Sequence, residues 1–96
     1  MSPKNKIKLK LLRKKLDKID NQLLKVVKKR TEIVKRVLLL KSRKKEIIDK
    51  RRISVVLKKI RNESLKKRID PKITQRIWKN MIWSYIDFER RNFKKK

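Results

Sequence analysis

The stretch LKLLRKKLDKIDNQLLKVVKKRTEIVKRVLLL, residues 9–40, decides the fold. Its aliphatic residues recur at alternating spacings of three and four, which is typical of a long helix that buries one seam. Arg30 is the one cationic residue in this seam, and a buried guanidinium is costly unless an anion meets it. The pattern predicts a helix over about residues 6–41 with an anion held near Arg30. The seam comprises Leu9, Leu12, Leu16, Ile19, Leu23, Val26, Arg30, Ile33, Val37 and Leu40.

The rest of the chain predicts two shorter helices, over about residues 49–68 and 71–93, after a connection at 42–48. Asp49 is suited to cap the first of them, and Asp70-Pro71 is a typical helix start. The expected fold is all-α, as one domain over residues 1–96 with three helices. The expected apolar faces are Ile53, Val56, Leu57 and Ile60 on the second helix, and on the third Ile73, Ile77, Met81 and Ser84, beside a stripe of Trp78, Ile82, Tyr85 and Glu89.

The apolar seam of the long helix continues for more than four heptads. Two shorter helices of the same chain are not long enough to cover it. A second copy of the chain is the simplest cover, so we expect an intertwined homodimer in which the long helices pair.

Composition restricts the chemistry. The chain has no His, Cys or Gly, so the commonest general base, thiolate chemistry and glycine-rich phosphate loops are absent, and we expect no metal and no cofactor. The net charge of +26 attracts small anions, nucleic acid and anionic membranes alike. The polar start resembles no signal peptide and no run is long enough to span a membrane, so we expect a cytoplasmic protein.

Cations along the long helix predict an anion pocket. Arg30 and Lys41 lie about three turns apart and can converge on one ligand. Arg13 lies roughly 42 Å from Lys41 along a straight helix, so it joins them only from the other subunit. With Arg52 as a fourth cation, the pocket suits a dicarboxylate, because Arg presents a planar fork to each carboxylate. Fixed cations and shape are sufficient for a unimolecular rearrangement of a dianion.

The segment LLRKKLDKIDNQLLKVVKKR, residues 11–30, resembles the first-helix signature of the all-helical chorismate mutases of the intertwined-dimer type. Lys41 and the Asp49-x-x-Arg52 spacing continue the likeness, which covers roughly residues 9–93. The resemblance implies an isomerase that converts chorismate to prephenate by a Claisen rearrangement. This is the branch step of the shikimate pathway towards phenylalanine and tyrosine.

The resemblance also implies a role for each matching residue. Arg13 reaches into the partner subunit's site and binds a carboxylate, and Arg30 binds the other carboxylate region. Lys41 hydrogen-bonds the ether oxygen and a carboxylate. Asp49 and Arg52 lie at the mouth of the second helix and contact the substrate hydroxyl.

Glu89 falls where the family has Gln or Glu facing the ether oxygen. A carboxylate helps there only when it is protonated, as a hydrogen-bond donor, so we expect faster turnover at mildly acidic pH. Two positions depart from the family: Ile53 replaces a glutamate and Tyr85 replaces a small polar residue, with Ser84 adjacent. The connection after Lys41 is one residue short, which leaves Arg51 as an alternative to Arg52.

Other interpretations stay open. Arg30 alone is equally consistent with a buried residue that sets helix register, paired with an acid such as Asp20 or Glu32 of a neighbour. The charge is consistent with a basic helical module that binds nucleic acid, or the chain is a dimerising interaction domain. A related fold also cleaves isochorismate to salicylate and pyruvate.

Overall fold

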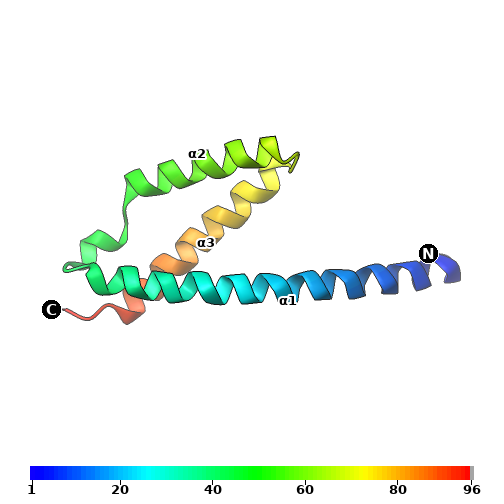
Figure 1. Ribbon diagram of the computed structural model, residues 1–96, viewed down its shortest axis with the longest axis horizontal. Helices are drawn as coiled ribbons and strands as arrows, with labels where there is room; N and C mark the ends of the chain where they lie inside the picture. The colour runs from blue at the N-terminus through cyan, green and yellow to red at the C-terminus, as the bar shows by residue number, and fades with distance from the viewer. Residues whose placement is uncertain (96) are drawn as a thin grey trace. The chain divides into compact units, whose positions relative to one another are not determined.

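The computed structural model describes residues 1–95, which form three α-helices and one short 3₁₀ helix (Figure 1). The helices are α1 (Pro3–Leu40), η1 (Lys44–Ile47), α2 (Lys50–Lys66) and α3 (Pro71–Asn92). Residues 1–95 contain no strand. The predicted all-α class, with one very long helix and two shorter ones, is confirmed. None of the described helices is both long and apolar enough to cross a membrane.

Aspartate caps begin both shorter helices. The Oδ1 atom of Asp49 accepts a hydrogen bond of 2.9 Å from the backbone N–H of Arg52, and Asp70 Oδ1 accepts one of 2.9 Å from that of Lys72. Pro71 occupies the first turn of α3, where its missing N–H costs nothing. Both predicted helix starts are confirmed, because each cap satisfies a backbone donor that the helix itself cannot.

The end of α2 is a Schellman turn without glycine. The backbone N–H of Ile69 donates to Ser64 O (2.8 Å) and that of Arg68 donates to Leu65 O (3.2 Å), which is the double bond pattern of this motif. Arg68 has a φ of 56°, in the left-handed region that favours glycine. This reversal ends α2 at Lys66, before the expected boundary near residue 68.

The chain divides into two compact units, Met1–Ile33 and Val34–Lys96. The first unit is the N-terminal part of α1, and within the single chain its predicted seam is open to solvent. Arg30 is half-buried. Between 51% and 58% of the surface is exposed at each of Leu12, Leu16, Ile19, Leu23, Val26 and Ile33.

The second unit contains a small core of Leu38, Ile47 and Ile86. At the end of α1 the core residue is Leu38, whereas the expected seam residues Val37 and Leu40 are 43% and 81% exposed. The seam expected from the heptad pattern is therefore wrong here, because the helix ends and its last turn must meet Ile47 of η1.

Helices α2 and α3 pack against each other (Figure 1). The expected face of α2 is the half-buried one, at Ile53, Val56, Leu57 and Ile60. On α3 the expected face is wrong in part, since Ile73 and Ile77 are 56% and 48% exposed. The neighbouring stripe turns inward instead, with Trp78, Ile82 and Tyr85 half-buried and Glu89 buried.

A buried pair of hydroxyl groups joins α2 to α3 near their connecting turn. Ser64 Oγ lies 2.7 Å from Thr74 Oγ1 and also donates to Ile60 O at 2.6 Å. Gln75, the residue after Thr74, donates from Nε2 to Leu57 O at 2.9 Å. These bonds fix how α3 lies along α2, and so fix where Glu89 emerges farther along α3.

Candidate active site

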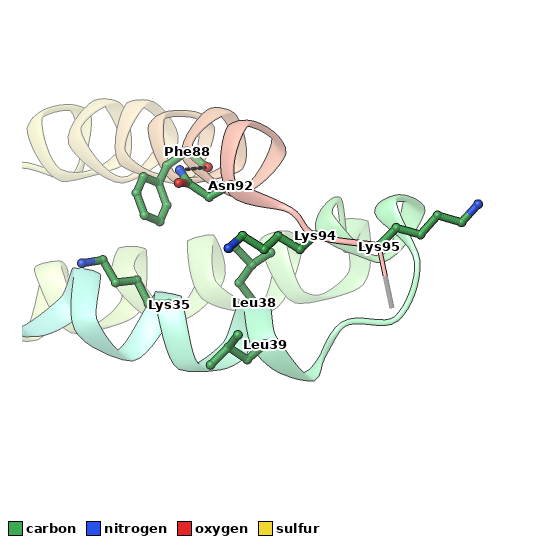
Figure 2. A pocket seen from close by; sticks show the side chains of 7 residues that line it. All are labelled: Lys35, Leu38, Leu39, Phe88, Asn92, Lys94 and Lys95. Atoms are coloured by element: carbon green, nitrogen blue, oxygen red, sulfur yellow. Dashed lines mark hydrogen bonds between the residues drawn. The ribbon is translucent and has the colours of Figure 1, made fainter.

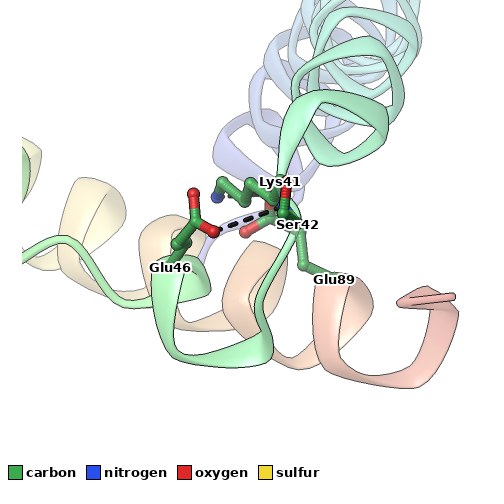
Figure 3. A network of polar contacts seen from close by, with 4 residues as sticks. All are labelled: Lys41, Ser42, Glu46 and Glu89. Atoms are coloured by element: carbon green, nitrogen blue, oxygen red, sulfur yellow. Dashed lines mark hydrogen bonds and ion pairs between the residues drawn. The ribbon is translucent and has the colours of Figure 1, made fainter. Parts of the chain in front are cut away.

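A partly buried ion pair joins the residue that follows α1 to the C-terminal half of α3. Lys41 Nζ lies 3.0 Å from Glu89 Oε1 (Figure 3). The side chain of Glu89 is 7% exposed and that of Lys41 is 18% exposed. Charge-assisted bonds of this kind are stronger than neutral ones, and burial removes the water that screens them.

The helical periodicity of α3 explains why a carboxylate is buried at this point. Glu89 continues the inward stripe of Ile82 and Tyr85, and it lies one turn from the core residue Ile86. A charge on such a stripe is costly unless it is paired, and Lys41 supplies the partner. The backbone N–H of Lys41 donates to Leu38 O at 3.1 Å, so the lysine extends directly from the core end of α1.

Glu46 organises the connection that follows Lys41. Its Oε1 atom accepts a hydrogen bond of 3.2 Å from the backbone N–H of Ser42 (Figure 3). The same atom accepts one of 2.9 Å from the backbone N–H of Arg43. The next residue, Ile47, is 4% exposed and anchors the connection in the core. Sequence reasoning missed the role of Glu46, although an acid placed three residues after Arg43 is a recognisable capping signal.

The mouth of α2 combines a cap with core packing. Asp49 and Arg52 are both exposed, and the carboxylate of Asp49 is engaged by the backbone N–H of Arg52. Ile53 is half-buried and packs against the Leu38, Ile47 and Ile86 core. Ile53, at the position where the resemblance implies a glutamate, therefore serves packing in this chain. Tyr85 is half-buried on the inward side of α3.

Arg13 and Arg30 belong to the first unit. Arg13 is exposed and lines an open depression of about 490 Å³ beside Leu9 and Asp17. Arg30 is half-buried and has a polar interaction. The structure thus brings together two of the predicted site residues, Lys41 and Glu89, in direct contact.

A separate hollow of about 330 Å³ lies between the end of α1 and the end of α3 (Figure 2). Its apolar surface comes from Leu38, Leu39 and Phe88, and none of the predicted site residues lines it. Asn92 donates its side-chain N–H to Phe88 O at 2.8 Å. The hollow is therefore distinct from the Lys41–Glu89 pair. Its remaining lining residues are Lys35, Lys94 and Lys95.

The chemistry available at the ion pair follows from its members. An ammonium group held in a poorly solvated place donates hydrogen bonds to an anion or to an oxygen that gains negative charge. The carboxylate beside it accepts a hydrogen bond when ionised and donates one when protonated. The pair therefore suits stabilisation of a charge-separated transition state more than attack by a nucleophile.

Comparison with known proteins identifies the family. The family model of chorismate mutase type II matches residues 12–90, which is most of the chain. No curated protein and no solved structure matches the chain. The family match includes the cationic positions of α1, the Lys41–Glu89 pair and the cap of α2. The chain belongs to the chorismate mutase type II family.

Proposed function

We propose that the protein is a chorismate mutase that rearranges chorismate to prephenate without a cofactor. The reaction is intramolecular: the ether C–O bond breaks while a new C–C bond forms, and no atom is gained or lost. The observation that supports it most is the partly buried Lys41–Glu89 pair, at 3.0 Å. In this pair Lys41 is a fixed cation that can stabilise negative charge developing on the ether oxygen, and Glu89 is its hydrogen-bonding partner.

Lys41 is the proposed electrostatic catalyst. In the free protein its ammonium group donates to Glu89, which keeps the lysine extended from the end of α1. With substrate bound, Lys41 donates to the ether oxygen and to a carboxylate. Glu89, when protonated, is the second donor to the same oxygen.

Arg13 and Arg30 are the proposed carboxylate ligands. Chorismate carries two carboxylates, and Arg binds each through two parallel N–H bonds. We propose that Arg30 acts within its own chain and that Arg13 of the partner subunit completes the site. The exposed aliphatic seam of the first unit supports a homodimer, because such a surface is stable in water only when another apolar surface covers it.

The start of α2 is the proposed contact for the ring hydroxyl. Asp49 and Arg52 are exposed there and one turn apart. Ile53 and Tyr85 give the adjoining wall an apolar character that a glutamate and a small polar residue would not give. The proposed setting is cytoplasmic biosynthesis of phenylalanine and tyrosine.

The test is chorismate consumption by purified protein, with the product identified by chromatography. Prephenate formation by the wild type and its loss in Arg30→Ala is the expected result, since removing a ligand to a buried carboxylate costs about 2–5 kcal/mol. Lys29→Ala is the matched control, because Lys29 is an exposed cation on the same turn. Absence of turnover by the folded wild type between about pH 5 and pH 8, or equal loss in both variants, contradicts the proposal. Salicylate as the product identifies the lyase reaction instead.

A further inference from the structure

Helix α3 carries one exposed stripe that takes no part in the proposed active site. At 3.6 residues per turn, its members fall within an arc of roughly 60° around the helix. Every member is exposed to solvent. We call this set the α3 basic stripe, and it consists of Lys72, Arg76, Lys79, Trp83 and Arg90.

Trp83 makes the stripe more than a row of surface cations. It is 54% exposed, whereas the other tryptophan of the chain, Trp78, is half-buried on the inward side of the same helix. An exposed indole offers a flat aromatic face that can stack on another ring. The nearest stripe cation, Lys79, lies one helical turn before it.

The stripe cations are available to an external anion. Within the part of the chain that the structure describes, none of the four forms an ion pair with a carboxylate. The adjacent acids are already engaged: Asp70 caps α3 through the backbone N–H of Lys72, and Asp87 pairs with Arg91 at 2.9 Å. An open depression of about 760 Å³ adjoins the first two stripe cations, lined also by Ile73 and Gln75.

The spacing of the stripe matches a linear ligand with repeated charges. Its first four members follow one another at three or four residues, which is a rise of roughly 4.5–6 Å each. Proteins that hold single-stranded nucleic acid combine a cationic track for the phosphates with aromatic side chains on which bases stack. In a duplex the base faces are already stacked on one another. A membrane surface calls for a broad apolar face opposite the cations, and the stripe has one aromatic residue only.

We infer that the α3 basic stripe binds single-stranded nucleic acid. Lys72, Arg76 and Lys79 contact successive phosphates, and Trp83 stacks on a base. The binding is independent of base sequence, because phosphate contacts carry no sequence information and every base offers a face for stacking. The inference is separate from the proposed rearrangement and does not rest on it.

Charge is tested first, with two variants that lose the same charges. The first is Lys72→Gln/Arg76→Gln/Lys79→Gln, and the control is Lys58→Gln/Lys59→Gln/Arg61→Gln on exposed positions of α2. Affinity for a fluorescent oligothymidine of about 15 nucleotides is measured by anisotropy over a range of salt concentrations. The stripe variant is expected to reduce the slope of log affinity against log salt by about 2, since each phosphate contact contributes about 0.7. Equal changes in the two variants mean attraction by net charge alone and overturn the inference.

Stacking is tested with Trp83→Leu and its aromatic control Trp83→Phe. The leucine variant is expected to bind roughly 5- to 100-fold more weakly, with an unchanged salt slope, while the phenylalanine variant keeps most of the affinity. In the wild type, the oligonucleotide should quench tryptophan emission, and the Trp83→Phe variant should lose that quenching even if the leucine variant folds poorly. Unchanged affinity in a folded Trp83→Leu variant overturns the inference. So does equal binding of a duplex, or binding of anionic phospholipid vesicles without binding of the oligonucleotide.

Discussion

The two units of the chain differ in whether they contain a buried apolar core. In Met1–Ile33 the aliphatic seam is more than half exposed at most of its positions. In Val34–Lys96 the residues Leu38, Ile47 and Ile86 retain at most 8% of their exposure. The second unit thus has a small core made of its own residues, whereas no residue of the first unit is buried within the single chain, and we propose that a second copy covers its seam.

Length is the physical origin of this difference. With 38 residues, α1 extends about 57 Å, whereas α2, with 17 residues, extends about 26 Å. A short helix can bury one face against a single neighbour, as α2 does against α3. A long helix with a continuous seam needs a partner of similar length, and a second α1 has that length and the same pattern.

The largest expected effect comes from placing charge on the seam. Leu16→Glu/Leu23→Glu puts two carboxylates where we propose that two copies of α1 meet, and burying unpaired charges costs several kcal/mol each. We expect the dimer to dissociate and chorismate turnover to fall by roughly 100-fold or more, because Arg13 of the partner subunit is lost from the site. Sedimentation velocity and activity are the measurements.

The matched control for this variant is Asn21→Glu/Gln22→Glu, which adds the same charges to the same exposed helix off the seam. It should remain dimeric and active. A seam variant that stays dimeric with normal activity would show that the first unit is not the interface.

The next effect concerns the buried pair of the second unit. Glu89→Gln keeps an oxygen that accepts from Lys41 and adds an N–H donor that does not depend on pH. A preorganised donor at a developing oxyanion is worth about 10²–10³ in rate, so we expect the variant to be roughly tenfold or more faster than wild type near neutral pH. The N–H donor of the variant does not depend on the protonation state of residue 89.

The pH–rate profile of kcat between about pH 5 and pH 8 is the measurement. Glu63→Gln is the control, because Glu63 pairs with the exposed Lys66 and Lys67 on α2, and its replacement should leave the profile unchanged. An identical, pH-dependent profile in the wild type and Glu89→Gln would remove Glu89 from the site.

A smaller effect tests how the second unit holds its two helices together. Ser64→Ala removes one of two buried hydroxyl groups 2.7 Å apart and leaves Thr74 with only a long contact of 3.4 Å to Pro71 O. We expect the free energy of unfolding to fall by about 1–3 kcal/mol, the cost of an unsatisfied buried polar group. Denaturant titration of Ser64→Ala, Thr74→Val and the double variant should show losses smaller than additive, and strict additivity would mean that the pair is not coupled.

The comparison also shows how far the sequence predicts this structure. The helix starts at Asp49 and Asp70 follow from local capping chemistry, and α1 follows from its periodicity. The inward face of α3 does not follow from the sequence, because the helix has two adjacent apolar stripes. Only packing against the rest of the chain determines that Trp78 and Ile82 turn inward and that Ile73 and Ile77 do not. The shift from Val37 to Leu38 has the same origin, since the core position depends on where η1 brings Ile47.

The same distinction between local rules and tertiary packing applies to the candidate site. The resemblance places Lys41 and Glu89 at the same ether oxygen of the substrate, but their direct contact was not predicted, because 48 residues separate them and no local rule joins them. The role of Glu46 was open to sequence reasoning, since its bonds lie within four residues. The inward direction of Ile53 follows from the periodicity of α2, but its packing partners do not, because they come from three different elements.

The smallest expected effect concerns the turn that ends α2, within the second unit. Arg68 adopts a φ of 56°, which costs a residue with a Cβ roughly 1–2 kcal/mol and costs glycine almost nothing. Glycine also increases the conformational entropy of the unfolded chain, which lowers the free energy of unfolding by about 0.4–1 kcal/mol. The net effect of Arg68→Gly should therefore be a rise of about 0.5–1 kcal/mol in the free energy of unfolding. Denaturant titration is the measurement, with Lys67→Gly as the control.

Lys67 precedes Arg68 with a φ of −89°, so glycine at residue 67 gains nothing from the left-handed region and should destabilise the protein. Stabilisation by both variants would mean that removing a positive charge, and not the backbone conformation, is responsible. Because the turn lies wholly within the second unit, Arg68→Gly should leave dimer dissociation and turnover unchanged. A change in either would show that the two units are energetically coupled through α1, and that the second unit is less self-sufficient than its core indicates.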